Sequence, residues 1–270
     1  MKYALITGAY GGMGKATVNA LKNAGYFVFA LDKRVEAPVD GVLPIAYDAT
    51  DGESVSNALL QVQSCTDHLD LVVHFAGIYT LNSLVEYTEE EFKRAFDINV
   101  FGVYRVNKAV LPLLTKGSKI IVTTSELAPL DPLPFTGLYA VTKSTLDKYA
   151  YSLRMELQLL GVSVVVLRPG AVDTGLLDVS TRALDAFCEN TALYSCNAAR
   201  FKRVVEGVEA RKVSPEKVGK KVAKIAGKRK PKYVYQLNRN PLLLLLNCLP
   251  KRLQTWIIKQ ILKERIEKRA

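Results

Sequence analysis

Short apolar runs alternate with longer segments whose apolar residues recur at helical spacing along most of the chain. The runs are mostly continuous, which is typical of parallel strands covered on both faces. We expect strands at Tyr3–Thr7, Tyr26–Leu31, Val42–Tyr47, Leu69–Phe75, Lys119–Thr124, Val162–Leu167 and Tyr233–Gln236. We expect helices at 12–24, 52–64, 88–115, 137–160 and 215–227. The alternation predicts an α/β fold, a single doubly wound parallel sheet with helices on both faces.

Neither an internal repeat nor a low-complexity linker divides the chain, so we expect one catalytic domain over residues 1–240. The stretch at about 175–212 has weaker periodicity and follows a strand end, where α/β folds place a substrate lid. Residues 241–270 form a basic, amphipathic segment that predicts a helical C-terminal extension.

The positive charge of the chain is concentrated in its last quarter. The net charge is +11, yet residues 1–199 hold 16 Lys and Arg against 21 Asp and Glu, whereas 200–270 hold 21 against 5. This distribution argues against a nucleic-acid partner, because aromatic residues are not interleaved with the charges. Apolar residues at helical spacing, with Trp256 among them, favour an anionic membrane surface as partner of 241–270. Docking of that helix on the body of the chain or on a second subunit stays open.

Four widely spaced cysteines and two histidines limit the chemistry further. No CxxC pair occurs, and His68 and His74 are wrongly spaced for two helical ligands, so we expect no metal site and reduced thiols. The first strand begins at once, so no signal peptide is expected. The run Leu242–Leu246 is far shorter than the roughly 20 residues of a membrane span. We expect a cytoplasmic protein, with peripheral membrane contact left open.

A glycine-rich loop, Thr7-Gly8-Ala9-Tyr10-Gly11-Gly12-Met13-Gly14, joins the first expected strand to the first helix. Glycines let a backbone approach a pyrophosphate, and the helix N-terminus supplies amide donors. Asp32 ends the second strand, where its carboxylate can accept hydrogen bonds from ribose hydroxyls and repel a 2′-phosphate. These features predict nucleotide binding and favour NAD, while Lys33 and Arg34 leave NADP open.

Three side chains suit carbonyl chemistry. Tyr139 and Lys143 stand four residues apart on an expected helix and therefore share a face. An ammonium group near a phenol lowers the phenol pKa toward the working range. Ser125 ends a strand and can donate a hydrogen bond to a carbonyl oxygen as charge develops there. Ser125 lacks a GxSxG elbow, and no motif places a histidine beside it, which argues against a serine hydrolase.

These motifs together resemble the short-chain dehydrogenase/reductase family over about residues 2–175. Thr7, Gly8, Gly12 and Gly14 match the TGxxxGxG loop of that family, and four residues match its catalytic set. The resemblance implies that Tyr139 exchanges a proton, Ser125 steadies the substrate oxygen, Lys143 lowers the tyrosine pKa and holds the ribose, and Asn99 helps to hold a relay water.

The resemblance also implies a set of cofactor contacts along the chain. Asp48 would neighbour the adenine ring, and the segment from Pro169 to Thr174 would meet the nicotinamide carboxamide. One departure is visible, because Phe75 stands where the family usually has an asparagine. The full expected set is Thr7, Gly8, Gly12, Met13, Gly14, Asp32, Asp48, Ala49, Ala76, Gly77, Asn99, Tyr139, Lys143, Pro169, Gly170, Val172 and Thr174.

The implied activity is NAD(P)-dependent interconversion of a hydrophobic secondary alcohol and a ketone. Residues expected near the substrate are mostly apolar: Leu127, Pro129, Leu130, Pro132, Leu133, Pro134, Phe135, Leu176, Leu177, Leu184, Phe187 and Tyr194. The apolar loop and the long extension are similar to those of hydroxysteroid and retinol dehydrogenases, which implies a steroid or bile acid. Ketoacyl reduction is a lesser option. Family habit also implies a homo-oligomer. Two alternatives stay open: a non-catalytic nucleotide-binding scaffold or regulator, and a membrane-surface adaptor.

Overall fold

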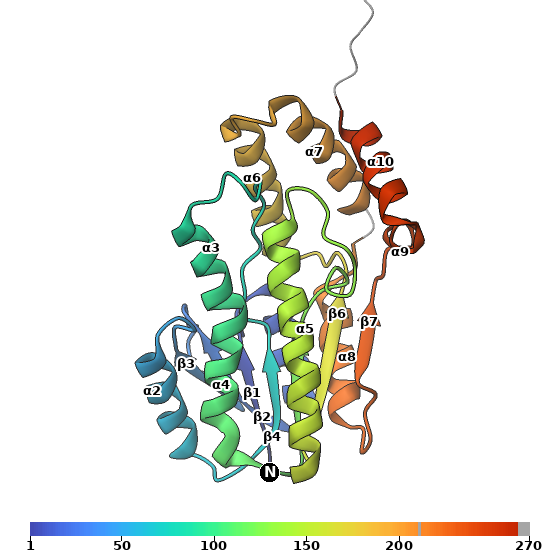
Figure 1. Cartoon of the computed structure of the whole chain (residues 1–270). Coiled ribbons are helices and arrows are strands. Elements are labelled where there is room, and N and C mark those ends of the chain that lie inside the picture. The colour runs from blue at the N-terminus through green and yellow to red at the C-terminus, as the bar shows by residue number, and fades with distance from the viewer. Residues whose placement is uncertain (210–211, 264–270) are drawn as a thin grey trace, which may run out of the picture.

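Seven strands form one parallel sheet in the computed structural model of the chain (Figure 1). The structure describes residues 1–209 and 212–263, with their side chains except those of 175–182, 196, 206, 208 and 209. The strands are β1 (Lys2–Thr7), β2 (Tyr26–Asp32), β3 (Val42–Ala46), β4 (Leu69–His74), β5 (Leu114–Thr123), β6 (Ser163–Pro169) and β7 (Val234–Leu237). Their order is β3-β2-β1-β4-β5-β6-β7, and neighbouring strands pair in parallel. The expected doubly wound fold is confirmed.

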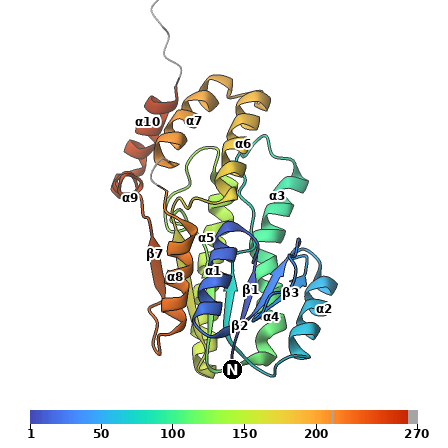
Figure 2. The same ribbon diagram turned by 180° about the vertical axis from the view of Figure 1, so that it is seen from behind.

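Helices cover both faces of the sheet. They are α1 (Gly12–Asn23), α2 (Gly52–Gln63), α3 (Glu89–Phe96), α4 (Gly102–Val110), α5 (Gly137–Leu157), α6 (Gly175–Asn190), α7 (Ser195–Glu209), α8 (Pro215–Ala226), α9 (Pro241–Cys248) and α10 (Lys251–Leu262). α2, α4 and α5 pack on one face, and α1 and α8 pack on the other (Figure 2). A Cβ on Gly219 would lie 2.4 Å from the carbonyl oxygen of Ala16, so α8 approaches α1 closely.

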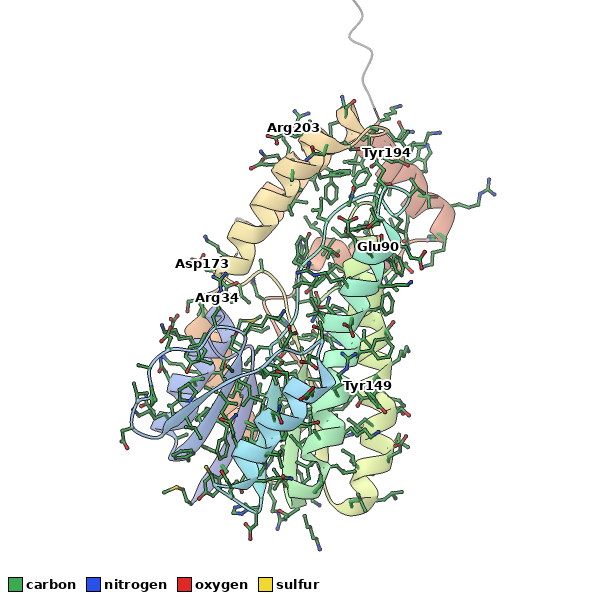
Figure 3. The ribbon with its side chains drawn as sticks, turned by 90° about the vertical axis from the view of Figure 1, so that its left-hand side faces the viewer. Arg34, Glu90, Tyr149, Asp173, Tyr194 and Arg203 are labelled. Atoms are coloured by element: carbon green, nitrogen blue, oxygen red, sulfur yellow. The ribbon has the colours of Figure 1, made fainter. Side chains whose placement is uncertain are left out.

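A third, smaller core lies above the carboxyl ends of the strands, beneath α6 and α7 (Figure 3). Its buried members are Leu81, Phe135, Leu184, Phe187, Ala198 and Phe201. The stretch at about 175–212 therefore contains two helices. Its periodicity is weak because these helices pack on a few residues from distant loops rather than on the broad apolar face of the sheet.

The prediction of one continuous helix over 88–115 is wrong. Thr88 and Glu91 form the expected capping box at the start of α3. A π-helical turn at Asp97–Phe101 then separates α3 from α4, and a 3₁₀ turn at Leu111–Leu113 follows α4. β5 begins at Leu114 because Pro112, in the 3₁₀ turn, lacks the N–H group that an α-helix needs.

The C-terminal helices lie against the body of the chain. The amide oxygen of Asn247 accepts a hydrogen bond from the backbone nitrogen of Asp131 at 2.8 Å, and Asn197 donates to the carbonyl oxygen of Leu262 at 2.7 Å. Gln254, on α10, is buried. Residues 264–270 lie outside the described residues, as do the side chains of Leu176 and Leu177. None of the described helices is long and apolar enough to cross a membrane.

Candidate active site

The glycine loop lies where the strand order changes direction. The chain leaves β1 toward β2 and later returns to β4 on the other side of β1, which opens a crevice at the carboxyl ends. Gly8 adopts a φ of +67°, and a Cβ on it would lie 2.6 Å from the nitrogen of Ala76. A Cβ on Gly14 would lie 2.0 Å from the carbonyl oxygen of Gly8. Glycine is therefore required at both positions for the loop to adopt this shape.

Helix α1 begins at this crevice with no side chain capping its first turn. Its first N–H groups are therefore available to an anion, which the positive end of the helix dipole also favours. Thr174, from the loop after β6, covers the helix start, since a Cβ on Gly12 would lie 2.6 Å from its Cγ2. Together these groups fit a pyrophosphate.

A cavity of about 460 Å³, here called the outer cavity, extends from the glycine loop over the ends of β2 and β3. Asp32, Arg34 and Arg94 contribute charged side chains to its wall. The Asp32 carboxylate accepts a hydrogen bond from the backbone nitrogen of Tyr10 at 2.9 Å, which fixes it at the end of β2. A ribose in this cavity would meet a fixed carboxylate.

Lys33 and Asp48 form an ion pair of 2.8 Å on the wall of the outer cavity. Burial raises the pKa of Asp48, but hydrogen bonds from Lys33 and Thr50 outweigh it and lower the pKa to about 2. Because Lys33 already pairs with a carboxylate, it is less available to bind a 2′-phosphate.

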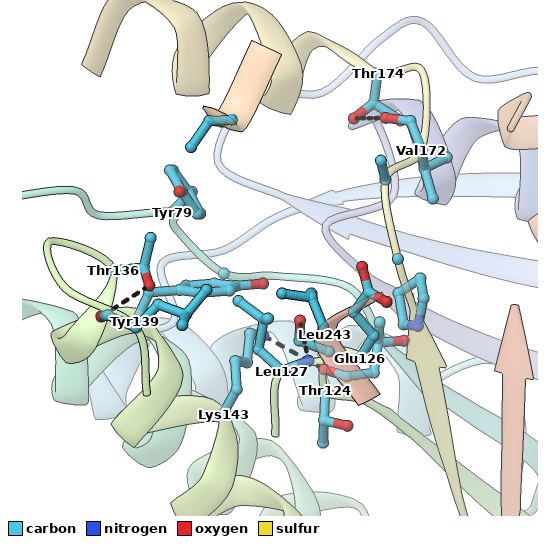
Figure 4. A pocket seen from close by; sticks show the side chains of 18 of the residues that line it. Tyr79, Thr124, Glu126, Leu127, Thr136, Tyr139, Lys143, Val172, Thr174 and Leu243 are labelled. Atoms are coloured by element: carbon cyan, nitrogen blue, oxygen red, sulfur yellow. Dashed lines mark hydrogen bonds between the residues drawn. The ribbon is translucent and has the colours of Figure 1, made fainter. Parts of the chain in front are cut away.

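A second cavity of about 240 Å³, here called the inner cavity, shares Phe75, Gly77 and Ile78 with the outer one. Tyr139 and Lys143 line it from α5, and Ser125 lines it from the end of β5 (Figure 4). The Ser125 hydroxyl accepts a hydrogen bond from the nitrogen of Leu127 at 3.2 Å. The three residues expected to perform the chemistry therefore converge on one cavity.

Lys143 is buried, and Tyr139 half-buried, in the wall of the inner cavity. The Lys143 ammonium lies 5.7 Å from the centroid of the Tyr139 ring and donates to the carbonyl oxygen of Thr123 at 3.3 Å. Burial lowers the pKa of Lys143 to about 8. Burial also raises the pKa of Tyr139 to about 12, against the opposing hydrogen bond with Ser125. In this structure burial therefore shifts the pKa of Tyr139 in the direction opposite to the lowering expected from a neighbouring lysine.

Asn99 lies within the π-helical turn, fully buried behind the inner cavity. Its amide oxygen accepts from the nitrogen of Ile78 at 2.8 Å, and its nitrogen donates to the Ile78 carbonyl at 3.0 Å and to the hydroxyl of Thr142 at 3.1 Å. A Cβ on Gly77 would lie 3.1 Å from Asn99 Oδ1 and 3.5 Å from Lys143 Nζ. Asn99 thus joins the loop after β4 to α5, and π turns of this kind are frequent at functional sites.

Most of the residues expected at the site line one of the two cavities. The outer cavity includes Gly8, Asp32, Asp48, Ala49, Ala76 and Gly77. The inner cavity includes Met13, Gly77, Ser125, Tyr139, Lys143, Pro169, Gly170, Val172 and Thr174. Thr7, Gly12, Gly14 and Asn99 are not among the cavity-lining residues and shape the surrounding backbone.

Residues that we expected near the substrate lie in different places. Leu127 and Leu133 line the inner cavity. Phe135, Leu184, Phe187 and Tyr194 instead belong to the small core beneath α6 and α7.

Sequence reasoning missed several residues of the inner cavity. Tyr79 packs on Tyr139 with ring centroids 4.9 Å apart, and Leu243 reaches the cavity from α9. Glu126 also lines it, directly after Ser125. The position of Glu126 next to the expected serine could have drawn attention to it, whereas no sequence signal places Leu243 there.

A nicotinamide dinucleotide fits these two connected cavities. The glycine loop would hold the pyrophosphate, Asp32 the adenosine ribose, and Lys143 the nicotinamide ribose. Gly77 stands at the junction, where any side chain would crowd Asn99 and Lys143. A parallel sheet with this crevice, and a tyrosine, a serine and a lysine that line one cavity beside it, defines a nicotinamide-dependent oxidoreductase of alcohols and ketones.

The chain belongs to the short-chain dehydrogenase family, whose model matches residues 2–185. It is an oxidoreductase that uses NAD or NADP. It is 28% identical over 230 residues to a 3-ketodihydrosphingosine reductase of Bacteroides thetaiotaomicron, with 85% of each chain covered. It is 29% identical over 201 residues to an NADPH-dependent 1-acyldihydroxyacetone phosphate reductase of Schizosaccharomyces pombe, covering 72% of this chain and 68% of that protein.

Solved structures share the fold. A short-chain dehydrogenase family protein from Francisella tularensis superposes with a TM-score of 0.74 at 21% identity, covering 88% of this chain and 97% of that one. A 3-ketoacyl-(acyl-carrier-protein) reductase from Brucella melitensis, complexed with NADH, gives a TM-score of 0.71 at 23% identity, covering 87% and 95%.

Proposed function

We propose that this protein reduces a ketone on a hydrophobic chain to the secondary alcohol, with Tyr139, Ser125, Lys143 and Asn99 as its catalytic set. The convergence of Tyr139, Ser125 and Lys143 on the inner cavity carries the proposal, because a protonated phenol, a hydroxyl and an ammonium group there can together meet a carbonyl oxygen. The apolar wall of the inner cavity supports the choice of substrate.

The residues divide the work of the reaction. When bound, the nicotinamide supplies the hydride that the carbonyl carbon receives. Tyr139 gives its hydroxyl proton to the carbonyl oxygen, and Ser125 donates a hydrogen bond to that oxygen as negative charge develops. Lys143 holds the ribose and returns a proton toward Tyr139. Asn99 keeps Ile78 and Thr142 in place around this path.

Two substrate classes compete for the inner cavity. The resemblance to hydroxysteroid dehydrogenases suggests a steroid, whereas two relatives are named for ketones that carry a long alkyl or acyl chain. Leu127, Leu133 and Leu243 supply a wall that an alkyl chain would fill. We therefore place a long-chain ketone first and a steroid second.

Asp32 supports NAD as the preferred cofactor. Its carboxylate is fixed by Tyr10 in the outer cavity and would repel a 2′-phosphate, while Lys33 is engaged by Asp48. Arg34 and Arg94 also line the cavity, so NADP remains the second cofactor to test.

A substrate panel tests the proposal. The purified protein is incubated with NADH or NADPH and with 3-ketodihydrosphingosine, 1-acyldihydroxyacetone phosphate or a 3-ketosteroid, and cofactor oxidation is followed by absorbance. We expect turnover of a long-chain ketone that Tyr139→Phe lowers by roughly a hundredfold or more, with nucleotide affinity retained. Unchanged turnover in Tyr139→Phe would refute the mechanism. Nucleotide binding without turnover of any ketone would favour the scaffold alternative.

The surface suggests two assembly properties. Tyr104 on α4 and Tyr151 and Met155 on α5 are exposed, as is Phe101 at the end of the π-helical turn, which supports the expected homo-oligomer through this surface. We expect sedimentation to show an oligomer that Tyr104→Glu with Tyr151→Glu dissociates. A monomeric parent protein would refute this assembly.

The C-terminal helices support peripheral contact of this enzyme, which we propose is cytoplasmic, with an anionic bilayer. α10 exposes Leu253 and Trp256, and the neighbouring side of the helix carries Arg252, Lys259 and Lys263, all exposed. Flotation with phosphatidylglycerol-containing vesicles should fall when Leu253 and Trp256 are changed to serine. Equal flotation of parent and variant would refute the contact, and loss of an oligomer instead would indicate a second copy of the chain as partner.

A further inference from the structure

Glu126 places a carboxylate in the wall of the otherwise apolar part of the inner cavity. Among the described residues that line this cavity, Glu126 is the one acidic side chain and Lys143 the one basic side chain. In Figure 4 the Glu126 carboxylate and the Tyr139 hydroxyl face the same space. The Lys143 ammonium and the Glu126 carboxylate lie in different parts of the wall. Lys143 donates to the carbonyl of Thr123 on β5.

The surroundings of Glu126 fix its position but leave its charge poorly compensated. Its Oε2 accepts a hydrogen bond from the backbone nitrogen of Asn240 at 2.7 Å. A Cβ on Gly170 would lie 2.1 Å from the carbonyl oxygen of Asn238 and 2.8 Å from Oε1, so the glycine makes room for both. Burial raises the pKa of Glu126, and the Asn240 hydrogen bond and nearby Arg239 oppose that rise. Glu126 is half-buried, and a carboxylate that is partly removed from water can accept about four hydrogen bonds and is unfavourable until donors meet it.

We propose that Glu126 recognises an ammonium group on the substrate carbon next to the reacting carbonyl. The proposal rests on the proposed function and narrows its substrate class to long-chain 2-amino ketones. With the carbonyl oxygen at Ser125 and Tyr139, the neighbouring carbon lies in the space that Glu126 faces. The alkyl chain would extend along Leu127, Leu133 and Leu243. Glu126 would act as a specificity-determining residue, and the proton and hydride would still pass through the groups already described.

If Glu126 has only a structural role, the Glu126→Gln variant should behave differently from what the recognition of an ammonium group predicts. If the carboxylate only anchors Asn240 at the start of α9, then Glu126→Gln, which keeps an acceptor of the same shape, would alter all substrates alike. Glu86→Gln is a matched control, because Glu86 is also a loop-anchoring carboxylate, accepting from Thr191 and the nitrogen of Ala192, and is not among the residues that line the cavity.

Three ketones separate the two roles: 2-amino-1-hydroxyoctadecan-3-one, its N-acetyl derivative without the charge, and octadecan-3-one. We expect the parent protein to favour the amine over the N-acetyl ketone in kcat/KM by roughly tenfold to a hundredfold, the range of a charge-assisted hydrogen bond. Glu126→Gln should abolish this preference and should raise rather than lower turnover of octadecan-3-one, whereas Glu86→Gln should keep the preference.

Binding of an unreactive ligand gives a second measurement. Dodecylamine should bind the NAD-loaded protein more tightly than dodecan-1-ol in calorimetry, and Glu126→Gln should remove the difference. Equal use of the three ketones, or a preference unchanged in Glu126→Gln, would overturn the recognition of an ammonium group and leave the proposed ketone reduction intact. Failure of every ketone would instead refute the proposed function, and the calorimetry would still decide whether Glu126 binds a cation.

Discussion

Replacing Lys143 with methionine should stabilise the folded protein while it abolishes turnover. Burial lowers the pKa of Lys143 from 10.5 to about 8, so the folded state must hold an ammonium group that would be more stable in water. The difference of two and a half pKa units corresponds to about 3 kcal/mol at 1.36 kcal/mol per unit. Loss of the hydrogen bond to the Thr123 carbonyl destabilises the folded variant by about 1 kcal/mol, which offsets part of this gain. We therefore expect Lys143→Met to raise the free energy of unfolding by about 2 kcal/mol at pH 7.

The sign of the pH dependence makes this expectation specific. Below pH 8 lysine is protonated in both states, and the full burial penalty applies. Between pH 8 and 10.5 the folded state loses its proton before the unfolded state does, so the parent protein gains stability relative to the variant. The difference in the free energy of unfolding between Lys143→Met and the parent protein should therefore narrow by about 2 kcal/mol from pH 7 to pH 9.5.

Urea unfolding followed by circular dichroism at pH 7 and 9.5 measures both effects. Lys148→Met is the matched control, because Lys148 is exposed on the same helix, and its removal should change stability by no more than about 0.5 kcal/mol. A Lys143→Met variant that is less stable than the parent at pH 7, or a gap that is the same at both pH values, would refute the reasoning.

Three further predictions address the cofactor and the proton path. Asp32→Ser should move the ratio of kcat/KM for NADH and NADPH toward NADPH by roughly tenfold or more, because it removes a charge that repels a 2′-phosphate; an unchanged ratio would contradict the placement of the ribose. Gly14→Ala should weaken NADH binding, measured by fluorescence titration, by roughly tenfold to a hundredfold, because its Cβ would lie 2.0 Å from Gly8 O, whereas Gly52→Ala, with nothing within 4 Å, should not. Ketone reduction should decline as pH rises through about 8, where Lys143 loses its proton; a rate that is constant from pH 7 to 9 would separate Lys143 from the proton path.

The strands and the glycine loop could be predicted because their signals are local. A parallel strand buried on both faces is a continuous apolar run, and β1, β2 and β6 begin and end within two residues of the expected bounds. The glycine loop is likewise defined by contacts within one β-α-β unit. Tyr139 and Lys143 share a face of α5 because four residues make about one helical turn.

The packing of α6, α7 and α9 over the site could not be predicted, because it depends on contacts between residues far apart in the sequence. α6 and α7 pack on Leu81 and Phe135, which come from loops after β4 and β5. Leu243 enters the inner cavity because Asn247 docks α9 on the backbone of Asp131, 116 residues away. The raised pKa of Tyr139 follows from burial, and its ring packs on Tyr79, 60 residues before it, whereas spacing alone suggested a lowering by Lys143.

The position of Glu126 also predicts which kinetic constants depend on an ammonium group in the substrate. As the hydride reaches the carbonyl carbon, negative charge develops on the oxygen that Ser125 and Tyr139 hold, in the cavity that Glu126 faces. A carboxylate without a counter-charge opposes that charge more strongly in the transition state than in the bound ketone. An ammonium group between them removes the repulsion, so its benefit should appear in kcat as well as in KM. Octadecan-3-one should therefore gain in kcat when Glu126 is changed to glutamine, a result that an anchoring role for Glu126 does not produce.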